Sequence, residues 1–289
     1  MYDRYVRYAR ERHAIYERRT QGLPRPWTDD KILDTYRFTN VFRELDATTV
    51  WYRENVRERY DGDKMTVLFA TVVFRLINRI KSGEAVFNQT VLGTGRTPFE
   101  DFLETGDFTT TKESLRSYCG AGPYVTGAYI INSPNGMDKL TGVLTMMQWV
   151  WNRRDELLYS VTIDNTLASA TKALTTVDHI AKFTAYEVVT DLRHTCVLRD
   201  ATDIMTWANP GPGAKRGLNR LYGRDLNKNQ PDHVFVCEMR DLLEHMNSQG
   251  VWPEDWPRWD MRDVEHTLCE FDKYERVRLG EGRPRGVYR

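Results

Sequence analysis

Two carboxylates and a histidine recur at helical spacing in VDHIAKFTAYEVVTDLRH, residues 177–194. In a helix, Glu187 and Asp191 share one face, and His194 follows Asp191 after three residues. Neighbouring carboxylates repel each other in water and persist more easily beside a cation, a metal ion or a reacting amine. The spacing indicates either an acid–base site, with Asp191 as base and His194 as its neighbour, or two solvated acids.

A second charged group lies in DVEHTLCEFDKYERV, residues 263–277. Glu265 and Glu270 alternate with Lys273 and Arg276 on the flanks of a predicted helix. Carboxylates and cations interleaved in this way can form an acid–base site beside an anion pocket. They can equally be ion pairs, three or four residues apart, that support the helix.

Glycine and proline precede a run of cations in WANPGPGAKRGL, residues 207–218. These residues turn the chain and allow the backbone to approach a ligand closely. We interpret Asn209 as part of such a turn, with Lys215 and Arg216 facing phosphate. The alternative is an ordinary solvated helix face.

The stretch RFTNVFREL, residues 37–45, predicts a helix with Arg37, Asn40 and Arg43 along one side. Such a row can grip a phosphate or the edge of a base. Surface ion pairs to neighbouring acids are the alternative.

Several classes of site are not indicated. No pair of the four cysteines has the spacing of metal ligands; they are Cys119, Cys196, Cys237 and Cys269. The sequence also contains no P-loop, HExxH, nucleophile-elbow or dinucleotide-binding motif. The Arg-rich N-terminus lacks the apolar segment of a signal peptide, and no stretch has the length of a membrane span. We therefore expect a soluble cytoplasmic protein with free thiols and without a metal site.

The elements that position these residues are predicted to be helices, since alternating strand patterns are almost absent. We expect an all-α fold over residues 1–289, either one domain or two helical lobes with a cleft between them. The helices are predicted near residues 3–19, 31–45, 66–78, 100–103, 112–119, 140–153, 166–173, 183–193, 235–249 and 260–278.

The motifs RFTNVFREL, VTGAYII, DHIAKFTAYEVVTDLRH, WANPGPGAKRGL and VEHTLCEFDKYERV followed by GRPR together resemble one family. It is the α-glutamyl/putrescinyl thymine pyrophosphorylase family, the helical domain associated with 5-hydroxymethyluracil DNA kinases, which phages use to hypermodify thymine. The resemblance covers about residues 34–285 and implies the helical architecture of helix-hairpin-helix DNA glycosylases. Residues 177–185 also resemble their hairpin, although His179 and Ala181 replace its glycines.

The resemblance implies a reaction on double-stranded DNA. A separate DNA kinase converts 5-hydroxymethyluracil to its pyrophosphate, and this chain lets an amine displace the pyrophosphate after the base leaves the stack. The amine is an amino acid, such as glycine or glutamate, or putrescine. Two alternatives stay open, a base-excision glycosylase and a non-catalytic DNA-binding module.

The resemblance selects positions, and we assign them roles. Asp191, His194, Glu270 and Lys273 are expected to be catalytic, while Glu187 and Glu265 bind the amine. Glu265 and Glu270 hold either the incoming ammonium or a Mg²⁺ ion, and no other cofactor is implied. DNA and pyrophosphate are expected to contact Arg37, Asn40, Arg43, Asn209, Lys215, Arg216, Arg276, Arg283 and Arg285.

Overall fold

The computed structural model describes residues 2–129, 131–284 and 286–287, and the regular secondary structure of these residues consists of helices. Among these residues no β-strand is formed, and the one pairing of extended backbone is an isolated antiparallel bridge between Tyr36 and Val287. The predicted all-α class is therefore confirmed.

The chain folds into two compact units. Unit 1 combines Met1–Asp46 with Asp203–Arg289, and unit 2 is the continuous segment Ala47–Thr202. The predicted residues are distributed over both units. A catalytic cleft between two lobes stays a prediction.

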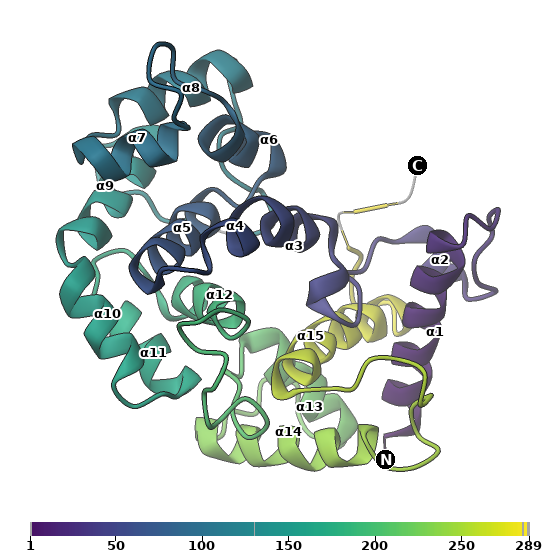
Figure 1. Ribbon diagram of the computed structural model, residues 1–289. Helices are drawn as coiled ribbons and strands as arrows, with labels where there is room; N and C mark the ends of the chain where they lie inside the picture. The colour runs from purple at the N-terminus through teal and green to yellow at the C-terminus, as the bar shows by residue number, and fades with distance from the viewer. Residues whose placement is uncertain (1, 130, 285, 288–289) are drawn as a thin grey trace. The chain divides into compact units, whose positions relative to one another are not determined.

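Unit 1 is built around its last helix. α15 packs against α1, α2, α13 and α14, so side chains from both ends of the chain meet on its surface. Figure 1 shows α13 and α14 alongside α15. The elements of unit 1 are α1 (Asp3–Thr20), α2 (Lys31–Thr35), the 3-10 helix η1 (Arg43–Leu45), α13 (Pro212–Leu221), α14 (Asp232–Met246) and α15 (Met261–Arg278).

Unit 2 surrounds the apolar helix α5, in which every residue from 67 to 77 is buried. This helix contacts α9, α10 and α12, and its formation confirms the helical interpretation of residues 66–78. The elements are α3 (Ala47–Tyr52), π-helix η2 (Arg53–Arg57), α4 (Glu58–Tyr60), α5 (Lys64–Ile77), α6 (Ile80–Gly83), π-helix η3 (Glu84–Asn88), α7 (Pro98–Thr105), α8 (Thr109–Cys119), α9 (Lys139–Asn152), α10 (Arg154–Thr162), α11 (Leu167–Leu174) and α12 (Lys182–Leu192).

Two glycines bring α13 against α15. A Cβ atom on Gly213 would lie 2.3 Å from Cys269 Sγ, and one on Gly217 would lie 2.5 Å from the Leu268 carbonyl oxygen. Pro212 occupies the first turn of α13, where its missing N–H costs no hydrogen bond. The motif GPGAKRGL therefore starts a helix and fits it closely to its neighbour.

The predicted helix over residues 31–45 is wrong. α2 ends at Thr35, and a one-turn 3-10 helix follows only at Arg43–Leu45. Between them, Asn40 donates its side-chain amide to the Leu45 carbonyl (2.7 Å) and its backbone N–H to Asp46 (2.9 Å). Such side-chain and backbone bonds compete with helical ones, so this segment does not present Arg37, Asn40 and Arg43 as a row along one helix.

Candidate active site in unit 1

A group of charged and polar side chains lies at the meeting point of α1, the segment before η1, and α15. We call it the polar cluster, and its members are Arg12, Asn40, Arg43, Asp46, His266, Glu270 and Lys273. Arg12, Asn40, Arg43 and Glu270 are each at most 8% exposed. Burial of so many charges costs free energy, and such sites are frequent candidates for function.

Asn40 fixes the geometry of the cluster. Arg12 donates to the Phe38 carbonyl (3.0 Å) and to Asn40 Oδ1 (2.7 Å), which orients the amide. The backbone N–H of Asn40 then donates to Asp46 Oδ1 at 2.9 Å. The extended segment thus turns Asp46 toward α15, an arrangement that the predicted helix would not have given.

Asp46 and His266 form the accessible part of the cluster. Asp46 Oδ2 lies 3.8 Å from His266 Nε2, and their side chains retain 24% and 15% of their exposure. Burial raises the pKa of Asp46 to about 6, although the N–H of Asn40 and the charges of Arg12 and Arg43 lower it. Asp46 is therefore a carboxylate that accepts protons near neutral pH and whose side chain still contacts solvent.

Glu270 is held by two donors. The Lys273 ammonium lies 2.5 Å from Oε1, and the Thr39 N–H donates to Oε2 at 3.2 Å. The negative charge of Glu270 also raises the pKa of Asp46. The structure thus joins the predicted catalytic pair Glu270 and Lys273 to Asn40 and Arg43.

Glu265 borders the cluster beside the Gly/Pro turn. Arg262 donates to Glu265 Oε2 at 2.6 Å, and a Cβ atom on Gly211 would lie 3.2 Å from Oε1. Two residues before Gly211, Asn209 is 6% exposed. The turn predicted from Asn209 to Gly213 therefore approaches a carboxylate of α15.

The cations of α13 face acids of unit 1. Lys215 pairs with Asp232 at 2.8 Å, and Arg216 donates to Asp272 at 2.9 Å. Arg220 and Arg276 also contact Asp272, whose side chain is 1% exposed. Residues 207–224 contain no acid, and the carboxylates that pair with their cations come from α14 and α15. A phosphate group would therefore have to compete with these ion pairs.

Asp191 belongs to a buried ion pair in unit 2. Arg75 binds both carboxylate oxygens, through Nε to Oδ2 and through Nη2 to Oδ1 at 2.8 Å. Asp191 is 0% exposed and Glu187 6%, so the interpretation of both as solvated acids is wrong. His194 is partly exposed beyond the end of α12.

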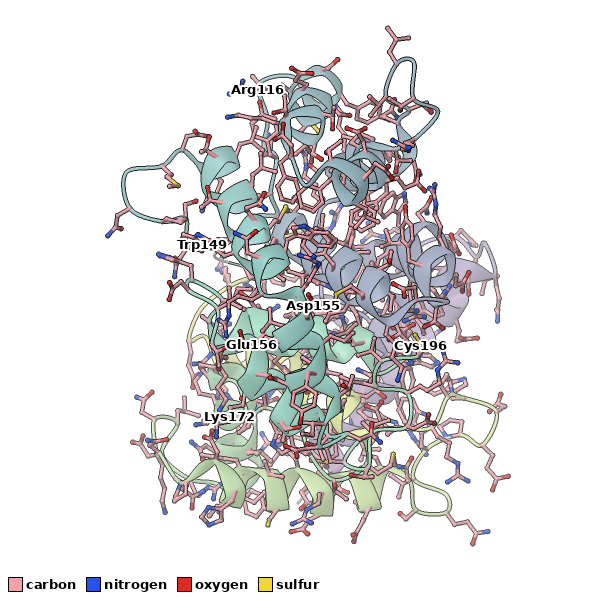
Figure 2. The ribbon with its side chains drawn as sticks, turned by 60° about the vertical axis from the view of Figure 1, so that its left-hand side comes forward. Arg116, Trp149, Asp155, Glu156, Lys172 and Cys196 are labelled. Carbon is pink, nitrogen blue, oxygen red and sulfur yellow. The ribbon has the colours of Figure 1, made fainter. Side chains whose placement is uncertain are left out.

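The turn between α11 and α12 adopts a glycine-like conformation. His179 has φ of +63°, which a glycine would adopt at no steric cost, and its ring stacks on Trp149 at 5.7 Å. Arg153 donates to the Thr176 carbonyl (2.8 Å) and pairs with Glu156. Figure 2 shows Trp149 on α9 and Glu156 on α10, the helices from which this turn is supported.

The remaining residues that were predicted to contact anions belong to the C-terminal segment or lie beside it. Arg37 and Arg283 are exposed, and the backbone N–H of Arg37 donates to the Gly286 carbonyl at 2.9 Å. Arg285 lies outside the described residues. All these assignments stay predictions.

Arg12, Asp46 and His266 were not selected from the sequence. Arg12 is one of six arginines in the first nineteen residues, and Asp46 lies just beyond the quoted motif. His266 follows Glu265 within the motif VEHTLCEFDKYERV, and this position is the signal by which it could have been selected as a site residue.

Two features are absent from the described part of the chain. No group of three or more His, Cys, Asp or Glu side chains there could hold a metal ion. Likewise, none of the helices in these ranges combines the length and apolar character needed to cross a bilayer.

Comparisons with known proteins agree with these motifs. Residues 1–283 match the family model described as "5-hmdU DNA kinase, helical domain". A protein of Bacillus phage SP10 named "5-hmdU DNA kinase" is 29% identical over 301 aligned residues, which cover 95% of this chain. The chain spans 45% of that relative's length. No solved structure matches significantly.

Proposed function

Because the chain belongs to the family of helical domains of 5-hmdU DNA kinases, we propose that it transfers an amine to modified thymine in DNA. The acceptor is the pyrophosphate ester of 5-hydroxymethyluracil, and the donor is an amino acid or putrescine. The observation that supports this proposal most is the polar cluster, where segments of two recognised motifs meet. We further propose that a separate 5-hydroxymethyluracil DNA kinase makes this pyrophosphate, as the family resemblance implies.

The reaction is a substitution at the methylene carbon on the uracil ring. The amine nitrogen forms the new C–N bond with its lone pair, and the C–O bond to pyrophosphate breaks. Pyrophosphate leaves with the electron pair of that bond. One proton of the ammonium must first pass to a base, since a protonated amine has no lone pair for attack.

Asp46 is suited to act as the general base that takes this proton. Its pKa of about 6 lies closer to neutral pH than that of an ordinary carboxyl, which favours proton transfer near pH 7. Asn40 orients one oxygen and His266 lies beside the other. Glu270 is the second acid, positioned by Lys273 and Thr39 to attract the incoming ammonium.

Cations of the same cluster are suited to stabilise pyrophosphate, the leaving group. Arg12 and Arg43 act electrostatically on Asp46, and Lys273 lies at the edge of the cluster with 29% of its side chain exposed. Positive groups fixed before the reaction stabilise charge that develops on departing phosphate oxygens. We therefore assign Arg43 and Lys273 to the pyrophosphate.

DNA binding is proposed for other parts of the chain. A helix-hairpin-helix architecture would direct the turn at His179 and the N-terminus of α12 toward a DNA phosphate, and the base would flip out to reach the site. Lys215, Arg216, Arg276 and Arg283 are proposed to contact the DNA backbone. Asp191, His194 and Glu187 remain proposed participants, although Arg75 occupies both oxygens of Asp191.

The test is nucleoside mass spectrometry of pyrophosphorylated DNA incubated with this protein and with glycine, glutamate or putrescine. We expect a nucleoside whose mass equals thymidine plus the amine minus two hydrogens. Release of a free base with alkali-labile DNA would show a glycosylase instead. DNA binding without any product would favour a module that serves the kinase, an alternative that the name of the phage relative supports.

A further inference from the structure

Three arginines of unit 1 surround one buried acid where α13 meets α15. We call this group the arginine cluster, and its members are Arg216, Arg220, Asp272 and Arg276. We propose that the cluster binds a phosphate group and that Glu281, just beyond α15, occupies the site until phosphate displaces it. The inference rests on the proposed function, in which Arg216 and Arg276 contact DNA, and it adds Arg220 and a competing acid to that site.

Asp272 holds the three arginines together. Its side chain is 1% exposed, and it accepts hydrogen bonds from Nε of Arg216 and Nε of Arg220 at 2.9 Å each. Nε of Arg276 lies 3.6 Å from Asp272 Oδ2. Because a buried carboxylate without its partners would be strongly destabilising, Asp272 keeps these guanidinium groups close to one another despite their mutual repulsion.

The cluster keeps hydrogen-bond donors that are not in use. The side chains of Arg216 and Arg276 are 36% and 39% exposed. Within residues 2–129, 131–284 and 286–287, Arg216 donates only through Nε, and Nε of Arg276 has no hydrogen-bond partner. The planar fork of guanidinium donors matches the oxygens of a phosphate group. An incoming phosphate can therefore use donors of Arg216 and Arg276 without breaking their contacts with Asp272.

Glu281 marks the position of an anion in the cluster. Nη2 of Arg220 donates to Glu281 Oε2 at 2.5 Å and Nη1 to Oε1 at 3.5 Å, while Nε stays on Asp272. The hydrogen bonds from Arg220 lower the pKa of Glu281, and the charge of Arg276 acts in the same direction. Arginine binds phosphate in the same two-bonded arrangement as carboxylate, so Glu281 stands where a phosphate group would bind.

The Glu281 side chain can leave while α15 stays in place. Its backbone N–H donates to the Arg276 carbonyl at 2.8 Å, which holds the main chain at the end of the helix. The side chain is 39% exposed, and exposed ion pairs contribute little to stability. After it leaves, Arg220 is still paired with Asp272. Three guanidinium groups then face one carboxylate, and this excess of positive charge attracts an anion.

Two titrations of Glu281→Gln protein, at one fixed salt concentration, test the proposal. Fluorescence anisotropy with an unmodified DNA duplex reports binding of backbone phosphate, and calorimetry with inorganic pyrophosphate reports binding of the leaving group. We expect at least one of these ligands to bind about fivefold more tightly than to the unmodified protein, because the carboxylate no longer competes. The ligand whose affinity increases identifies the source of the phosphate.

Glu254→Gln is the matched control, because Glu254 is exposed, lies between α14 and α15, and loses the same charge. Its affinities should equal those of the unmodified protein. In a double-mutant cycle, the gain from Glu281→Gln should disappear when Arg220→Gln is also present. Arg216→Gln leaves the Glu281 contact in place and should weaken binding of the same ligand about fivefold, which tests the site even where Glu281→Gln protein is unstable.

The proposal is overturned if folded Glu281→Gln protein binds DNA and pyrophosphate with unchanged affinity, if its gain persists beside Arg220→Gln or equals that of Glu254→Gln, or if Arg216→Gln protein binds normally. A lower Tm with unchanged affinities would show that Glu281 serves only to stabilise the end of α15. Tighter binding by Glu281→Gln, without any modified nucleoside, would refute amine transfer and leave the phosphate site. Amine transfer with unchanged binding in Glu281→Gln would do the reverse.

Discussion

Asp46 combines burial with access, which makes it the residue whose substitution is most informative. Its folded pKa of about 6 exceeds the ordinary value of 3.8, so the folded protein binds more protons than the unfolded chain between these pH values. The free energy of unfolding therefore falls as pH rises from about 4 to 6. The charged carboxylate costs at most about 3 kcal/mol above pH 6.

We expect Asp46→Asn to abolish amine transfer and to raise Tm at pH 7–8. The amide still accepts from the Asn40 N–H but carries no charge that burial would destabilise. Loss of a positioned base typically costs about 10²–10⁴ in rate. Product formation and thermal melting across pH 4–8 check both effects, and a protein that is less stable yet active would contradict them.

Asp191 was predicted from the sequence to be a catalytic base, whereas the structure places it in a buried ion pair with Arg75. We expect Asp191→Asn to destabilise the fold by about 3–5 kcal/mol, because Arg75 would keep a buried charge without its partner. Urea unfolding measures this loss. A variant of normal stability that fails in catalysis would instead support Asp191 as the base.

Residue types in the motifs indicated part of the site. Glu265, Glu270 and Lys273 were selected because acids and cations alternate at helical spacing in residues 263–277. Asn40 and Arg43 were selected as part of a row along a predicted helix that the structure does not form. Arg12 and Asp46 could not be selected, since their importance arises from contacts across long sequence separations.

At the scale of elements, the contact between α13 and α15 positions Glu265 and Glu270. We expect Gly217→Ala to destabilise the protein by about 1–3 kcal/mol and to reduce activity, because its Cβ would lie 2.5 Å from a backbone oxygen. Gly62→Ala is the control, since no atom lies within 4 Å of its added Cβ. Equal melting temperatures for the two variants would show that α13 can move aside without cost.

Helices with a clear apolar pattern or a capping signal were predicted correctly. The segment before η1, in which side-chain hydrogen bonds compete with helical ones, was not. α5 follows its apolar pattern, and α15 begins at Met261, directly after the N-cap residue Asp260, whose capping box with Asp263 fixes the start of the helix. Residues 37–42 have helical spacing, yet the side chain of Asn40 diverts the backbone. Periodicity does not reveal such local hydrogen bonds.

At the scale of the whole molecule, the chain passes from unit 1 to unit 2 and back. Unit 2 is continuous and has its own core around α5. We therefore expect residues 47–202, produced alone, to be helical and to melt cooperatively, with Arg75 still paired to Asp191. Circular dichroism and thermal melting test this, and a non-cooperative or disordered fragment would contradict it.

We propose that the polar cluster of unit 1 performs amine transfer on pyrophosphorylated 5-hydroxymethyluracil in DNA. The most direct measurement is the ratio of pyrophosphate released to amine-modified nucleoside formed, for the unmodified protein and for Asp46→Asn. We predict a ratio of about one for the unmodified protein, as substitution requires, and neither product for folded, DNA-binding Asp46→Asn. Pyrophosphate release without a nucleoside that carries the new C–N bond, or normal turnover by Asp46→Asn, would contradict amine transfer by this cluster.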